Sequence, residues 1–159
     1  MPLSRYRYRL SRVWERDEPR VCWILLNPST ATEWLDDPTI TRVTGFSRRW
    51  GFGSAVVVNL FALRSTDPTA LHLAPDPVGP ENDAAIVEAV ESADAVLVAW
   101  GNHGNIINPL TGSPRHLEAS SLLTPDAEIH CLGLTVEGQP RHPLYLRATT
   151  RPELLPRSA

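Results

Sequence analysis

Four apolar runs recur along the chain, and each has the length of a strand that is buried on both faces. They cover residues 21–26, 55–60, 95–99 and 129–132. Strands of a parallel sheet have near-continuous apolar sequences because helices cover both of its faces, whereas half-exposed strands alternate apolar and polar residues. The four runs therefore predict four buried, parallel strands.

Helical patterns separate these runs. Apolar residues recur at helical spacing over residues 38–50, residues 81–92 are amphipathic, and residues 113–123 begin with Ser113 as a cap and Pro114 at the first helical position. Strands that alternate with helices indicate an α/β fold. We expect a three-layer sandwich with a mostly parallel, four-stranded central sheet, in a single domain over residues 1–159.

The N-terminal segment has a different pattern, which alternates from residue 4 to residue 14. It places Arg5, Arg7 and Arg9 on one face and tyrosines on the other. This is the period of a half-buried strand, so we expect an edge strand, or a hairpin with the run at residues 21–26. The arginine row is either a solvated edge or a surface that faces phosphate.

Composition supports an ordinary globular domain: of the 159 residues, 42% are hydrophobic and 21% are charged. Cys22 and Cys131 lie in apolar runs and are expected to be core residues rather than a disulfide. No run is long enough for a membrane helix, so we predict a cytoplasmic protein with no membrane contact. The histidines lack a ligand spacing, and neither a metal nor another cofactor is expected.

The cationic residues narrow the chemistry, because all 15 are arginines. A chain without lysine has only its α-amino group for Schiff-base formation. Residues 1–64 hold 10 arginines against 6 acidic residues, residues 65–136 hold 1 against 10, and residues 137–159 hold 4 against 2. This distribution is either ordinary solvated charge or a basic face that attracts phosphate, with acidic residues on the opposite side.

Polar residues follow the predicted strands where ligands bind to open α/β sheets. Asn27 and Asn59 each end an apolar run, Trp100-Gly101 follows the third, and His142 lies in the loop after the fourth. Ligands bind beyond the carboxyl ends of parallel strands, so these residues are candidates for one site. Each residue also has a purely structural interpretation, as a turn, a cap or a loop contact.

Four of these positions resemble motifs of the uracil-DNA glycosylase superfamily. Asn27-Pro28 resembles the Asn-Pro motif of its mismatch-specific branch, and Asn59 resembles a base-reading asparagine. Residues 98–101 are similar to the end of a later strand, and His142-Pro143-Leu144 resembles a His-Pro-Ser-Pro-Leu motif. The resemblance implies a glycosylase-like fold with its site at the carboxyl ends of the strands.

The chain as a whole is also similar to a bacterial and phage family labelled domain of unknown function 1643. The segments that carry this similarity are Leu26–Ala31, Asp36–Thr39, Arg48–Gly51, Val58–Ala62 and Arg141–Tyr145. That family implies no particular activity.

The resemblance to glycosylases implies an N-glycosylase or a related hydrolase that acts on a nucleobase in DNA or in a nucleotide. Asn27 would orient a water molecule, His142 would hydrogen-bond the leaving base, and Asn59 would read the base. Asn27 is not a carboxylate, although Asp36, Asp37 or Asp67 could supply one. The other candidate substrate-binding residues are Pro28, Ser29, Phe46, Phe61, Trp100, Gly101 and Arg141, with Trp34 as a further stacking residue.

A second hypothesis keeps the same pocket without turnover. In this case the protein binds a nucleotide or nucleic acid, and the arginine-rich segments contact phosphate. DNA, a nucleotide or a nucleobase is therefore the expected partner under both hypotheses.

Overall fold

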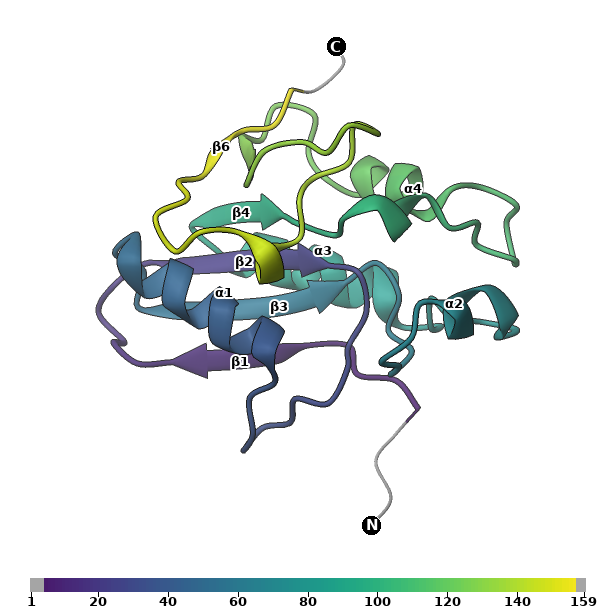
Figure 1. Ribbon diagram of the computed structural model, residues 1–159, viewed down its shortest axis with the longest axis horizontal. Coiled ribbons are helices and arrows are strands. Elements are labelled where there is room, and N and C mark those ends of the chain that lie inside the picture. The colour runs from purple at the N-terminus through teal and green to yellow at the C-terminus, as the bar shows by residue number, and fades with distance from the viewer. Residues whose placement is uncertain (1–4, 157–159) are drawn as a thin grey trace.

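The computed structural model describes residues 5–156 and contains one six-stranded mixed sheet (Figure 1). Its strand order is β1-β3-β2-β4-β5-β6. The strands are β1 (Leu10–Val13), β2 (Arg20–Leu25), β3 (Ser54–Asn59), β4 (Ala95–Val98), β5 (Ile129–Cys131) and β6 (Glu153–Leu154). The four inner strands β3, β2, β4 and β5 are parallel, whereas β1 and β6 pair antiparallel at the two edges. The four predicted parallel strands are confirmed, β1 is the edge strand expected in the N-terminal segment, and only β6 was not predicted.

The helices follow the predicted order with small differences. They are α1 (Pro38–Arg49), α2 (Thr69–Leu73), α3 (Asn82–Ser92) and α4 (Arg115–Ser121), with short 3-10 turns at η1 (Asn102–Asn105) and η2 (Pro143–Tyr145). The expected cap at Ser113 is wrong: Pro114 is extended, with ψ of 129°, so α4 begins one residue later and no side chain caps it. Helix α2 was not among the predicted helices.

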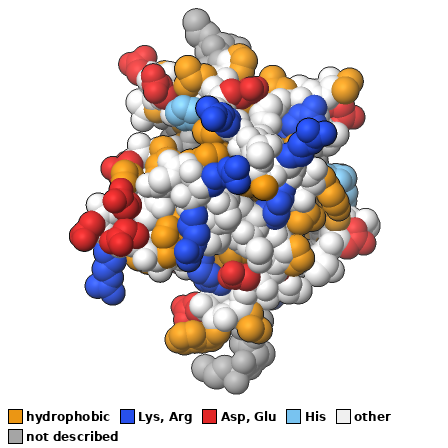
Figure 2. All heavy atoms as spheres, turned by 60° about the vertical axis from the view of Figure 1, so that its left-hand side comes forward, with side chains coloured by type: hydrophobic (Ala, Val, Ile, Leu, Met, Phe, Trp, Pro, Cys, Tyr) orange, Lys and Arg blue, Asp and Glu red, His pale blue; other side chains and the backbone are white. Residues whose placement is uncertain are grey.

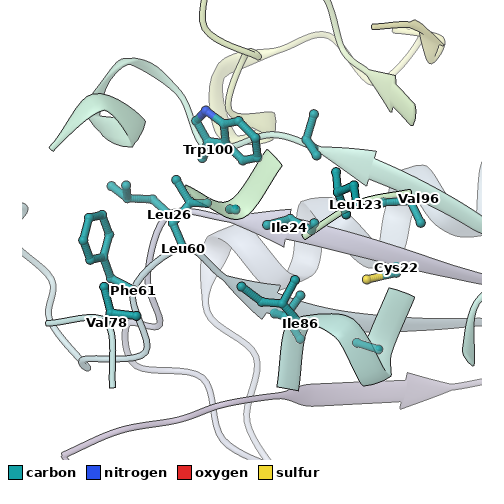
Figure 3. Close-up of a cluster of buried hydrophobic side chains, with 14 of the residues drawn as sticks. Cys22, Ile24, Leu26, Leu60, Phe61, Val78, Ile86, Val96, Trp100 and Leu123 are labelled. Atoms are coloured by element: carbon teal, nitrogen blue, oxygen red, sulfur yellow. The ribbon is translucent and has the colours of Figure 1, made fainter. Parts of the chain in front are cut away.

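Alternate residues of the inner strands face two separate cores. Val21, Trp23 and Leu25 point to one face, where Val43 and Phe46 of α1 cover them. Cys22, Ile24 and their neighbours point to the other face, against α3 and α4 (Figure 3). Because helices cover both faces, β2, β3 and β4 are apolar on both sides, whereas the short β5 has His130 on one side.

The two cysteines lie in the core, as predicted. Cys22 and Cys131 are both buried and unpaired. Burial raises the pKa of the Cys22 thiol to about 12.

The N-terminal segment departs from the expected hairpin. Strand β1 covers only Leu10–Val13 and pairs with β3 rather than β2. The reason is that β2 has parallel neighbours on both sides, β3 and β4, which leaves it no free edge. The segment before β1 does not form a regular strand, so its arginines do not share one face. Arg5 and Arg9 are exposed, but Arg7 is buried.

None of the helices within residues 5–156 is long and apolar enough to cross a membrane.

Candidate functional site

A large cavity lies beyond the carboxyl ends of the parallel strands. We call it the strand-end cavity; its volume is about 690 Å³. Its walls come from the ends of β2 and β4, the start of α1, residues 65–68 and the loop that carries His142. Asn27, Ser29, Asp37, Trp100, Gly101, Arg141, His142 and Tyr145 are among the residues that line it. Asn27, Trp100, Gly101 and His142, which the sequence places beyond strand ends, therefore line one hollow.

A second, much smaller cavity adjoins the first. We call it the inner cavity; its volume is about 30 Å³. Asn27, Ser29, Asp37, Thr39 and His142 line both cavities, while Arg7, Leu25, Ile40 and Asn59 line only the inner one. The inner cavity thus brings together Asn27, Asn59 and His142. In the sequence, 115 positions separate Asn27 from His142.

Asn59 is the last residue of β3, and its side chain is 1% exposed. Among the described residues, neither its Oδ1 nor its Nδ2 has a hydrogen-bond partner. An unpartnered buried amide costs roughly 1–3 kcal/mol, so native proteins rarely keep one without a water or a ligand to satisfy it. Asn59 is the clearest sign that something binds in the inner cavity.

Arg7 brings a buried positive charge to the same cavity. Its Nη1 donates to the Ala31 carbonyl at 2.7 Å, but its Nε is buried and has no partner within the described residues. Burial, together with the positive charge of Arg64, lowers the pKa of Arg7 to about 10. At neutral pH the guanidinium remains charged and can donate to a bound group.

Asn27 has a fixed orientation. Its Nδ2 donates to three backbone carbonyls, those of Pro28 at 3.1 Å, Leu63 at 3.3 Å and Ser65 at 2.9 Å. Because three acceptors surround that end of the amide, the other end must be the oxygen. Oδ1 is therefore the atom that Asn27 can offer to a ligand, as an acceptor.

His142 is held as a neutral donor. Its Nδ1 accepts a hydrogen bond from the Leu144 amide at 3.2 Å, so the proton of the neutral ring is on Nε2. Burial lowers the pKa of His142, and the negative charge of Asp37 partly opposes this effect. At neutral pH the ring is uncharged, with an N–H available to a ligand.

Asp37 adds the carboxylate that the motif comparison lacked. It caps α1, with Oδ1 accepting from the Ile40 amide at 2.9 Å, and its Oδ2 accepts from the Ala31 amide at 3.2 Å. Each carboxylate oxygen has two lone pairs, so both can accept a further hydrogen bond. Of the three aspartates considered above, Asp37 alone lines the cavities, whereas Asp36 is exposed and paired with Arg12 at 2.9 Å.

The other predicted residues are divided between the site and the core. Trp100, Gly101, Ser29 and Arg141 line the strand-end cavity, and the Trp100 indole donates to Gln139 Oε1 at 2.8 Å. Pro28 is buried and lines neither cavity. Its carbonyl accepts a hydrogen bond from the amide of Ser65, which lines the strand-end cavity.

The aromatic side chains expected to stack on a base are elsewhere. Phe46 packs in the core against Trp23 and Trp50, and Phe61 is fully buried on the opposite face of the sheet. Trp34 is 86% exposed and lines neither cavity. The expected stacking residues are therefore corrected: the aromatic residues on the strand-end cavity are Trp100 and Tyr145. Tyr145 carried no signal beyond its place after His142-Pro143.

No group of three or more His, Cys, Asp or Glu side chains in the described part of the chain is arranged to hold a metal ion.

Together these features define an α/β protein with a mixed sheet and a polar, two-part cavity at the strand ends. The chain belongs to the family described as protein of unknown function (DUF1643), which it matches over residues 7–144. That match includes every residue that lines the inner cavity, from Arg7 to His142. Searches of the curated proteins and of the solved structures found no match, and the comparisons give no support to a resemblance with uracil-DNA glycosylases.

Proposed function

We propose that this protein is a hydrolase that holds its water molecule in the inner cavity and its substrate in the strand-end cavity. The observation that carries this proposal is the buried, unpartnered carboxamide of Asn59, which shares a small space with Asn27, Asp37 and His142. The reaction we propose is cleavage of an N-glycosidic bond to a nucleobase, on a glycosylase-like α/β fold.

The size of the inner cavity supports a water molecule rather than a base. A single water occupies on the order of 10–15 Å³ of such space and needs two to four polar partners. The cavity measures about 30 Å³, and its unused polar atoms include both ends of the Asn59 amide and Arg7 Nε. We therefore assign Asn59 to the water, in place of the base-reading role that the resemblance to glycosylases implies.

The residues common to both cavities can then act between water and substrate. Asn27 Oδ1 accepts a hydrogen bond from the water and so orients its lone pair. We assign the Asp37 carboxylate, which lines both cavities, to stabilising the positive sugar of an oxocarbenium-like transition state. His142 donates a hydrogen bond from Nε2 to the departing base, which leaves with the electron pair of the C–N bond and keeps a negative charge until solvent protonates it. The water adds to the sugar carbon and passes its proton to the Asp37 carboxylate, which returns it to solvent.

The walls of the strand-end cavity suit a flat, polar ring. Tyr145 and Trp100 offer aromatic surface, and Arg141 offers a guanidinium. Base rings stack well on such side chains. A volume of about 690 Å³ accommodates one nucleotide with part of the adjoining phosphate backbone.

The test is release of free base from a panel of deaminated and modified oligonucleotides and nucleosides, followed by liquid chromatography. We expect His142→Ala and Asn27→Ala each to lower the rate by about 100-fold. His72→Ala is the matched control, because His72 is exposed on α2 and lines neither cavity. If correctly folded wild-type protein releases no base from any member of the panel, the proposal is wrong.

The same contacts also fit a non-catalytic alternative, a nucleotide or nucleic-acid binding protein with the same pocket. Asn27 and Asp37 both hydrogen-bond the backbone around the cavity, which a passive pocket needs as much as an active one. This alternative predicts salt-sensitive ligand binding that survives His142→Ala. It fails if neither nucleotides nor nucleic acids bind at low salt.

A further inference from the structure

A seam between α1 and the chain segment 141–152 leads away from the strand-end cavity. The two elements lie side by side, and α1 contacts η2 within this segment (Figure 1). Pro38 and Thr39 at the start of α1, together with Tyr145 and Leu146, form one wall of the strand-end cavity. The seam therefore begins at the proposed site.

Two further hollows continue the seam along α1. The first, of about 270 Å³, lies between Ala148 and residues Thr41, Arg42, Gly45, Phe46 and Arg49 of α1. The second, of about 440 Å³, is lined by Arg49, Trp50, Thr149, Thr150, Arg151 and Pro152. Arg49 lines both, so the hollows adjoin and extend to the far end of the helix.

The seam is basic along its length. Arg42, Arg49 and Arg151 line the two hollows, and no acidic residue does. Within the described residues, none of the three arginines has a carboxylate within 4.0 Å, whereas Arg12 and Arg115 are paired. The guanidinium carbon of Arg42 lies 5.1 Å from the centre of the Phe46 ring. The Nε of Arg42 is buried and has no hydrogen-bond partner among the described residues. Figure 2 shows arginines gathered on the side of the molecule that holds the C-terminal end of α1.

The length and chemistry of the seam fit a short stretch of nucleic acid. Helix α1 has 12 residues, which at 1.5 Å each span about 18 Å. A stacked strand, with phosphates about 3.4 Å apart along its axis, would place about five nucleotides over that distance, and an extended single strand would place fewer. Threonine hydroxyls at 41, 149 and 150 add hydrogen-bond donors for phosphate oxygens.

We propose that the seam binds the phosphate backbone of single-stranded nucleic acid, which delivers one nucleotide to the strand-end cavity. A single strand fits because a base can enter the cavity only when it is unpaired and unstacked. The proposal deepens the proposed function by naming a polymer as its substrate. Binding along the seam does not itself require turnover.

The test measures fluorescence anisotropy of a labelled oligothymidylate of about ten nucleotides over a range of salt concentrations. The seam variant is Arg42→Gln/Arg49→Gln/Arg151→Gln. The control is Arg5→Gln/Arg9→Gln/Arg16→Gln, because these three arginines are exposed and line none of the three cavities of the seam. Both variants lose three positive charges from a net charge of −3, so both reach −6.

We expect the seam variant to bind at least about tenfold more weakly and to reduce the slope of log K against log salt by about two, while the control stays within about twofold of wild type. Equal loss in both triple variants would overturn the proposal, since the effect would then reflect net charge. Tighter binding of a duplex than of the single strand would also overturn it. Seam-dependent binding without any base release would uphold the seam and refute the hydrolase, so the two proposals fail separately.

Discussion

Replacing Asn59 with leucine tests whether the inner cavity serves a ligand or the fold. Leucine has as many non-hydrogen side-chain atoms as asparagine, and the adjoining cavity of about 30 Å³ gives room for its bulkier methyl groups. In the wild type, a fully buried amide has no partner among the described residues. Such an amide costs roughly 1–3 kcal/mol, of which a bridging water recovers a part. We expect Asn59→Leu to raise the free energy of unfolding by about 1 kcal/mol.

The assay is urea unfolding, with thermal unfolding as a check. For a domain of this length, 1 kcal/mol corresponds to a shift of about 2–4 °C in Tm. Turnover on any substrate found in the panel should fall by about 100-fold in the same protein. Gain of stability with loss of activity is the signature of a residue that is kept for function.

Asn82 provides the matched control, because it is also a fully buried asparagine close to the end of β3. Its Nδ2 donates to the carbonyls of Asn59 and Leu60, at 2.9 Å and 3.0 Å. Asn82→Leu removes both bonds and is expected to lose about 2 kcal/mol. If Asn59→Leu destabilises the protein as much as Asn82→Leu, Asn59 is part of the structural framework and our reasoning is refuted.

Four further changes test other parts of the structure. Asp37→Ser keeps a capping oxygen but removes the carboxylate, so the free energy of unfolding should change by less than about 0.5 kcal/mol while turnover is lost. Asp37→Ala removes the cap as well and should lower the free energy of unfolding by about 1 kcal/mol, measured by urea unfolding. Arg115→Met removes the donor to the Leu60 carbonyl at 2.7 Å and should cost about 2 kcal/mol, against less than about 0.5 kcal/mol for the exposed Arg16→Met. In the folded protein the pKa of His142 is below its ordinary value of 6.5, so the unfolded chain binds this proton first as pH falls. Below about pH 6.5, the free energy of unfolding should therefore fall more for wild type than for His142→Gln. Equal losses in the two proteins would contradict this. Since burial raises the pKa of both Cys22 and Cys131, a thiol–disulfide exchange reagent should label native protein far more slowly than unfolded protein, and rapid labelling of the native thiols would show that they are accessible.

The inner sheet could be predicted because β2, β3 and β4 are apolar on both faces, a pattern that few other elements share. Strand β6 could not, since it has two exposed residues and no pattern of its own. The pairing of β1 was missed because proximity in sequence favours a hairpin, whereas the outcome depended on which strand had a free edge. Helix α2 has five residues inside a polar loop, too few for a periodic signal.

The site was predicted in part. Asn27, Asn59 and His142 were found because they follow strand ends, and parallel strands bring their ends together. Arg7 was missed because its burial depends on the carbonyl of Ala31, a contact that no local pattern encodes. Arg115 lines neither cavity, but the sequence carried a signal for its structural role: it is the single arginine among ten acidic residues in residues 65–136. In the structure it is 1% exposed.

Asp37 also has a consequence for motion. One carboxylate holds the amide of Ala31 in the loop before α1 and the amide of Ile40 in the first turn of the helix. When the carboxylate no longer accepts these two hydrogen bonds, both segments are released together, so the loop and the first turn of the helix should open as one cooperative unit. Amide hydrogen exchange should then show Ala31 and Ile40 exchanging at similar rates and slowing together when a ligand fills the cavity. The entrance to the site would in that case be gated by the fraying of a helix end.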